Sequence, residues 1–168
     1  MATWIDYTYL IDDKKIPNLT DLSIVGTSLQ TQVQRFINHY EPEYLKFVLG
    51  ETLYNECIAG LTVVTPDAKW TALKAKFVDS TNKLSPIANY VYRKLAQKTK
   101  IFWIQTGEGE NTVQYTREGL ADSWNDMVYQ TAEIVEWLED NSATYPNYLL
   151  NDCEDLEKYI VLDNEFGI

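Results

Sequence analysis

The sequence has a single histidine, His39, and only two cysteines, Cys57 and Cys153. One histidine cannot supply the Glu-x-x-His pairs of di-iron bundles or a His-rich zinc site, which argues against a metal centre. Two isolated cysteines argue against a disulfide framework, so we expect free thiols in a reducing compartment. Neither a Gly-x-Ser-x-Gly motif nor a cysteine beside a histidine occurs. We therefore predict no catalytic, cofactor-binding or metal-binding residues in this sequence.

Long apolar runs and basic residues are also scarce. No segment approaches the roughly 20 apolar residues that a membrane span needs, and the N-terminus lacks the basic and apolar regions of a secretion signal, so we expect neither. The 14 Lys and Arg residues stand against 25 Asp and Glu residues, which gives a net charge of −11. This charge opposes tight DNA binding, but it would suit a surface past which DNA slides without adhering.

The chain is rich instead in helical periodicity. Its 168 residues, of which 45% are apolar, are enough for one domain with a core. Apolar residues at three- and four-residue spacing, preceded by cap residues, predict an all-α bundle of about five helices. The expected helices cover approximately residues 27–40, 42–58, 66–78, 85–104 and 116–140.

The junction between the first two of these helices organises the pattern. Pro42 suits a first helical turn, and Glu41 and Glu43 suit the positive end of a helix dipole, so we place the start of the second helix there. Gly50 interrupts the apolar run of that helix and marks a kink or a close approach. Gly60 is a suitable residue for its C-cap.

Three segments lie apart from the packed helices of the bundle domain, residues 27–145. Residues 1–26 contain β-prone aromatic residues and predict an extended N-terminal arm, which packs either on its own domain or on a neighbour. The acidic segment 105–115 predicts a long loop between the fourth and fifth helices, and residues 146–168 predict a C-terminal tail.

Two charged helix faces remain open to more than one interpretation. The basic face of the fourth helix consists of Arg93, Lys94, Lys98 and Lys100. We favour a solvated face that pairs with acidic neighbours over a phosphate track or a contact for an acidic partner. The fifth helix carries the carboxylates Asp126, Glu133, Glu136 and Glu139. Here we favour a solvated face over a metal site, because no second set of ligands is present.

Several short motifs follow one another in a defined order. They are residues 37–45 (INHYEPEYL), 49–54 (LGETLY), 86–92 (PIANYVY), 106–109 (TGEG), 124–128 (WNDMV) and 164–168 (NEFGI). In this order they resemble parts of the head-to-tail connector proteins of tailed bacteriophages. The first two motifs are similar to the opening helices of these proteins, and the third is similar to the start of their fourth helix. The last three are similar to the polar loop, the next helix and the C-terminal ending. The similarity is to the adaptor or ring proteins of crAss-like and related Bacteroides phages, and it runs from about residue 28 to the C-terminus.

The resemblance implies a non-enzymatic structural protein of the virion. Such proteins are small helical bundles that assemble as a ring, commonly of twelve copies, beneath the portal protein. The ring joins the head to the tail, contacts the portal on one side and a tail or second ring protein on the other, and continues the DNA channel. DNA would be only non-specific channel content. The expected location is the head-tail junction of a virion assembled in the cytoplasm of the host bacterium.

Aromatic residues in the arm, the long loop and the tail are the candidate contacts for neighbouring subunits. This hypothesis names Trp4, Tyr7, Tyr9, Trp103, Tyr115 and Phe166. An acidic helical protein that binds a protein partner as a monomer or dimer has the same composition and is the alternative.

Overall fold

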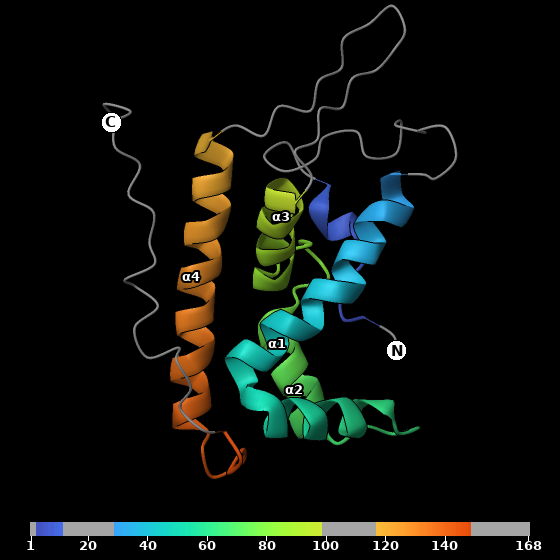
Figure 1. Ribbon diagram of the computed structural model, residues 1–168. Helices are drawn as coiled ribbons and strands as arrows, with labels where there is room; N and C mark the ends of the chain where they lie inside the picture. The colour runs from blue at the N-terminus through green and yellow to red at the C-terminus, as the bar shows by residue number, and fades with distance from the viewer. Residues whose placement is uncertain (1–2, 12–28, 99–116, 149–168) are drawn as a thin grey trace, which may run out of the picture.

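The part of the chain that the structure describes is helical. The computed structural model describes residues 3–11, 29–98 and 117–148. Its elements are the 3-10 helix η1 (Tyr7–Leu10) and the α-helices α1 (Leu29–Thr62), α2 (Ala68–Phe77), α3 (Pro86–Lys98) and α4 (Arg117–Asp140) (Figure 1). Within these ranges the only β-type pairing is an isolated bridge between Asp79 and Leu84. The predicted all-α class is confirmed.

Helix α1 continues through Pro42 and bends at Gly50. Gly50 has φ 73° and ψ 159°, a non-helical conformation that glycine adopts without a steric penalty. Figure 1 shows that the two parts of α1 run in different directions. Pro42 removes one backbone donor, but the neighbouring Tyr40 and Tyr44 are buried and hold this part of α1 against the core. The helix start expected at Pro42 is therefore wrong, and the kink expected at Gly50 is confirmed. Among the described residues there are four α-helices, because the first two expected helices are merged into α1.

Gly60 is a close-approach point and does not end its helix. Helix α1 extends to Thr62, and a Cβ atom placed on Gly60 would lie 2.1 Å from the indole ring of Trp70. Since that separation is far below a van der Waals contact, only a residue without a side chain lets α1 approach α2 here. The expected C-cap role of Gly60 is wrong for this reason.

The starts of α2 and α3 follow the local signals in the sequence. The side chain of Asp67 accepts a hydrogen bond from the backbone N–H of Lys69 at 3.0 Å and caps α2. The hydroxyl of Ser85 accepts a hydrogen bond from the N–H of Ile87 at 3.2 Å and caps α3, whose first residue is Pro86. Both predicted helix starts are confirmed.

The hydrophobic core lies among α1, α3 and α4. Helix α3 packs against both α1 and α4 and lies between them in Figure 1. The hydroxyl groups of Tyr44 in α1 and Thr131 in α4 form a buried hydrogen bond of 2.5 Å. This bond connects the two outer helices of the core and satisfies polar groups that burial would otherwise leave unpaired.

Residues 3–11 form part of this core. The side chain of Asp6 caps η1 by accepting a hydrogen bond from the N–H of Thr8, and Trp4, Ile5 and Leu10 are buried. Instead of an extended segment, this part of the expected arm is a short helical turn packed on its own domain. The rest of the arm, the loop 105–115 and the tail beyond residue 148 lie outside the described residues.

Candidate functional site

A buried carboxylate in α1 binds the N-terminal segment. Glu41 is only 3% exposed, and its two oxygens accept hydrogen bonds from two consecutive backbone N–H groups. The N–H of Trp4 donates to Oε1 at 2.7 Å, and the N–H of Ile5 donates to Oε2 at 3.1 Å. Because both donors belong to the main chain, the carboxylate recognises the backbone of this segment and not its side chains. We call the surface around Glu41 that holds residues 3–11 the N-terminal docking site.

Residues of α2 complete the docking site. The ring of Trp4 packs edge-on against Phe77, with ring centroids 5.6 Å apart, and the ammonium of Lys74 lies 6.0 Å from the Trp4 ring. Burial raises the pKa of Glu41 from 4.5 to about 7, against the opposing effects of the two backbone hydrogen bonds and of Lys74. Burial thus has the larger effect on the pKa of this carboxyl group.

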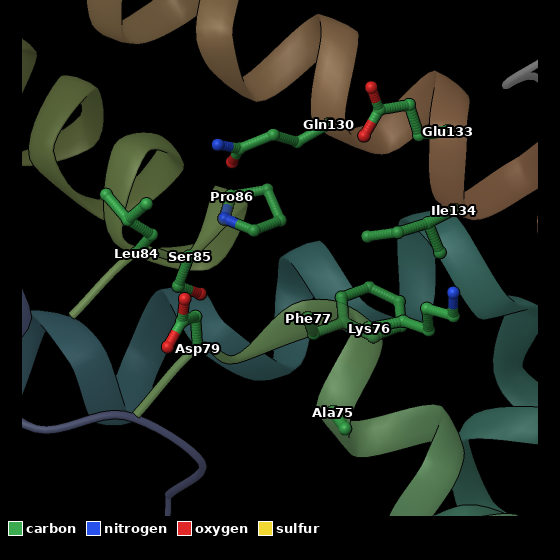
Figure 2. A pocket seen from close by; sticks show the side chains of 10 residues that line it. All are labelled: Ala75, Lys76, Phe77, Asp79, Leu84, Ser85, Pro86, Gln130, Glu133 and Ile134. Carbon is green, nitrogen blue, oxygen red and sulfur yellow. The ribbon is translucent and has the colours of Figure 1, made fainter. Parts of the chain in front are cut away.

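A hollow of about 210 Å³ lies where α2, α3 and α4 meet (Figure 2). Its lining consists of Ala75, Lys76, Phe77, Asp79, Leu84, Ser85, Pro86, Gln130, Glu133 and Ile134. The Oε1 atom of Gln130 is buried and has no hydrogen-bond partner. The Asp79 carboxylate accepts hydrogen bonds from the N–H groups of Asn82 and Thr81, which lower its pKa. The hollow therefore offers hydrogen-bond acceptors to a ligand, but neither a histidine nor a cysteine lines it.

Helix α4 carries an exposed acidic surface. We call its exposed carboxylates Asp122, Asp126, Glu133, Glu136 and Asp140 the acidic stripe. Since an α-helix has 3.6 residues per turn, the spacing of these residues places them along one side of α4. None of the ion pairs in the described part of the chain involves the stripe. The side chain of Tyr129, which is 53% exposed, lies on the same side.

The solvated face expected on the fifth helix is confirmed for Asp126, Glu133, Glu136 and Glu139, which are all exposed. Residues 3–11, 29–98 and 117–148 contain no group of three His, Cys, Asp or Glu side chains that is arranged to hold a metal ion. The acidic stripe thus presents negative charge to solvent along one helix.

The basic side chains are distributed quite differently from the acidic ones. Seven of them lie over aromatic rings: Lys46, Lys69, Lys74, Lys76, Lys83, Arg93 and Lys94. The guanidinium of Arg93 lies 4.0 Å from the ring centroid of Trp124. The ammonium of Lys94 lies 3.0 Å from the carboxylate of Glu43. The favoured interpretation of the basic face, pairing with acidic neighbours, is confirmed for Lys94.

The candidate interface residues fall into two groups. Trp4 and Tyr9 are buried in the core of their own chain, and Tyr7 is half-buried. The other three, Trp103, Tyr115 and Phe166, lie outside the described residues. The structure thus supports packing on the same domain for Trp4 and Tyr9, and their contact with a neighbouring subunit stays a prediction.

The role of Glu41 was missed, although the sequence contains a signal for it. Glu41 lies four residues after Ile37 and four before Leu45, and both are fully or almost fully buried. An acidic residue at a core position of an amphipathic helix needs a buried hydrogen-bond partner. The partner itself was not predictable, since Trp4 lies 37 residues away in the sequence.

The comparisons with known proteins add no relative. No protein-family model, curated protein or solved structure matches the chain. Among the described residues, no helix combines the length and the apolar character needed to span a membrane. The resemblance to phage connectors therefore stays a prediction.

Proposed function

We propose that this chain is a structural subunit of a ring in the head-to-tail connector of a tailed bacteriophage. The observation that carries the proposal is the acidic stripe on α4, whose carboxylates are exposed and have no basic partner among the described residues. In a ring around a channel, one copy of this stripe from each subunit would form a negatively charged wall. Such a wall repels the phosphates of DNA and lets it pass without adhering.

The dimensions and charge of α4 agree with this role. At about 1.5 Å per residue, the stripe extends for about 27 Å of α4 from Asp122 to Asp140, so it is more than a local cluster. The last turn of α4 contains no basic residue, although cations are the residues that stabilise the C-terminal end of a helix. The negative charge is thus maintained along the helix even where helix stability favours the opposite sign.

Exposed apolar side chains provide surfaces for subunit contacts. The turn between α1 and α2 carries Val63 and the fully exposed Val64, and Leu84 is exposed at the rim of the hollow. Contacts between two different surfaces of identical subunits close into a ring when the rotation between neighbours permits. These residues are therefore candidates for the ring interface, in addition to the aromatic residues of the arm, loop and tail.

The alternative is an acidic module that binds one protein partner as a monomer or dimer. The observation that favours it is Tyr129, an exposed aromatic residue within the acidic stripe. Tyrosine is frequent at protein interfaces, and a basic partner would be attracted by the surrounding carboxylates. In this case the stripe would be a binding surface for a protein and not a channel wall.

Mass measurement distinguishes the two functions. We would measure the purified full chain by native mass spectrometry, alone and with the portal protein of the same phage. A closed assembly of many copies, in either sample, supports the ring. A monomer or dimer that does not change on addition of the portal protein contradicts it.

A second experiment tests the channel wall directly. Duplex DNA binding at low salt would be compared between the wild-type assembly and a variant with Asp126→Lys. We expect measurable DNA retention only in the stripe variant, because a lysine at this position attracts phosphates where the carboxylate repels them. The control variant, Glu139→Lys, makes the same change of charge at an exposed position of α4 outside the stripe. Equal retention by both variants would show that total charge, and not the stripe, excludes DNA.

A further inference from the structure

The N-terminal docking site has the properties of a receptor for a peptide segment. Its central contact, the Glu41 carboxylate, binds two backbone N–H groups and is almost inaccessible to solvent. Its apolar part receives Trp4, which packs on Phe77, together with the fully buried Leu10. A segment with the same sequence from any copy of the chain would make the same contacts.

The length of chain next to the docked segment permits exchange between copies. Residues 12–28 join the docked segment to the start of α1. At about 3.3 Å per residue, a connection of this length reaches at most roughly 55 Å when extended. That span exceeds the length of α4, the longest straight helix described, so the length of this connection does not restrict the segment to its own chain.

The central polar contact is made by a single side chain. Burial disfavours the ionised form of Glu41, whereas the two N–H groups of the docked segment favour it. The charged group that faces Glu41 is Lys74 of α2, which favours the ionised carboxylate, and the phenol of Tyr54 in α1 lies within electrostatic range. The identical segment of a neighbouring copy offers the same two backbone N–H groups to this side chain.

We propose that, in the assembled protein, the docking site binds residues 3–11 of the adjacent copy. Each subunit then binds the next through Glu41, while in a single chain the segment occupies its own site and keeps it closed. Exchange of an identical element between protomers forms an interface without new contacts, and close neighbours raise the effective concentration of the segment. This inference rests on the proposed function, because it requires adjacent copies.

Cysteine pairs across the docking site test the exchange. The side chains of Thr3 and Gln34 meet at the edge of the site, with Gln34 Nε2 lying 3.3 Å from Thr3 Oγ1. Both side chains are polar and half-buried at the edge of the site, so we expect Thr3→Cys and Gln34→Cys to leave the fold intact. Both would be made with Cys153→Ser, while the buried Cys57 is retained. A short bismaleimide, which spans the space left by the shorter cysteine side chains, would link the two thiols.

The decisive sample mixes chains that carry only Thr3→Cys with chains that carry only Gln34→Cys. After assembly and cross-linking, we expect covalent dimers on a denaturing gel. A control mixture of Thr3→Cys with Glu51→Cys, which places the second thiol at an exposed position outside the docking site, should give none. The double variant Thr3→Cys with Gln34→Cys should give covalent oligomers in the assembly and only internally linked monomers at high dilution.

The outcomes separate this inference from the proposed function when native mass spectrometry is run on the same samples. Rings that contain only internally linked chains would overturn segment exchange and leave the ring intact. Covalent dimers without larger assemblies would support exchange and contradict the ring. Monomers without intermolecular links in any mixture would overturn both.

Discussion

The substitution Glu41→Gln is expected to change how the stability of the protein depends on pH. The pKa of Glu41 is raised by burial from 4.5 to about 7 in the folded protein. A carboxyl group with a raised pKa in the folded state contributes stability that is fully present below about pH 4.5 and is lost as the pH rises through about 7. The wild-type protein should therefore become less stable between pH 5 and pH 8 through this residue.

The expected size of the effect follows from the pKa difference. A difference of about 2.5 pH units, at about 1.4 kcal/mol per unit, corresponds to a loss of about 3 kcal/mol in the free energy of unfolding. Glutamine has no charge to titrate, so this loss is absent in the variant. Glutamine also replaces one acceptor by a donor, which leaves one of the buried N–H groups of Trp4 and Ile5 unpaired at a cost of about 1–3 kcal/mol.

The two effects together predict that the stability curves converge or cross. At pH 5 the Glu41→Gln variant should be less stable than the wild type, and by pH 8 the difference should shrink or reverse. Urea denaturation followed by circular dichroism at pH 5, 6, 7 and 8 measures this. Parallel curves for the two proteins would refute the reasoning.

Glu43→Gln is the matched control on the same helix. Burial opposes ionisation of Glu43, but hydrogen bonds from Tyr90 and Lys94 outweigh it and lower its pKa. A carboxyl group with a lowered pKa contributes stability that is lost only as the pH falls through that value. Its replacement should therefore not alter the slope between pH 5 and pH 8.

Three further substitutions test the backbone and the charge distribution. Gly50→Ala should destabilise the protein by about 1–3 kcal/mol, because alanine does not tolerate φ 73° with ψ 159°; unchanged urea stability would mean that α1 does not need this conformation. Gly60→Ala should lower the free energy of unfolding by about 1–3 kcal/mol and alter tryptophan fluorescence, because the Cβ atom of the alanine would overlap the Trp70 ring. Unchanged stability and fluorescence would contradict this close packing. Asp140→Lys should raise the free energy of unfolding by about 0.3–1 kcal/mol at low salt, because it places a cation at the C-terminal end of the α4 dipole; a gain that persists at 1 M salt would exclude an electrostatic cause.

Features decided by neighbouring residues were predictable from the sequence. The starts of α2 and α3 are set by Asp67 and Ser85, whose side chains bind N–H groups two residues further along the chain. The bend at Gly50 is likewise a local backbone property. In each case the residues that determine the structure lie within one helical turn of one another.

Features decided by tertiary packing were not predictable. The local preference of Pro42 for a first helical turn was overridden, because the buried residues around it keep α1 continuous. The docking of residues 3–11 depends on a carboxylate more than 30 positions away, and the hollow is assembled from α2, α3, α4 and the segment between α2 and α3. No short stretch of sequence contains the information for either.

The placement of charge, and not composition alone, gives α4 its acidic surface. Seven basic side chains lie over aromatic rings, whereas the carboxylates of the acidic stripe form no ion pair in the described ranges. Glu41, by contrast, lies in the core, where its burial serves the attachment of the N-terminal segment. Neutralising the stripe should therefore leave docking unchanged, and opening the docking site should leave the charge of α4 unchanged. The proposed repulsion of DNA and the proposed contact between subunits can thus be tested independently in the same chain.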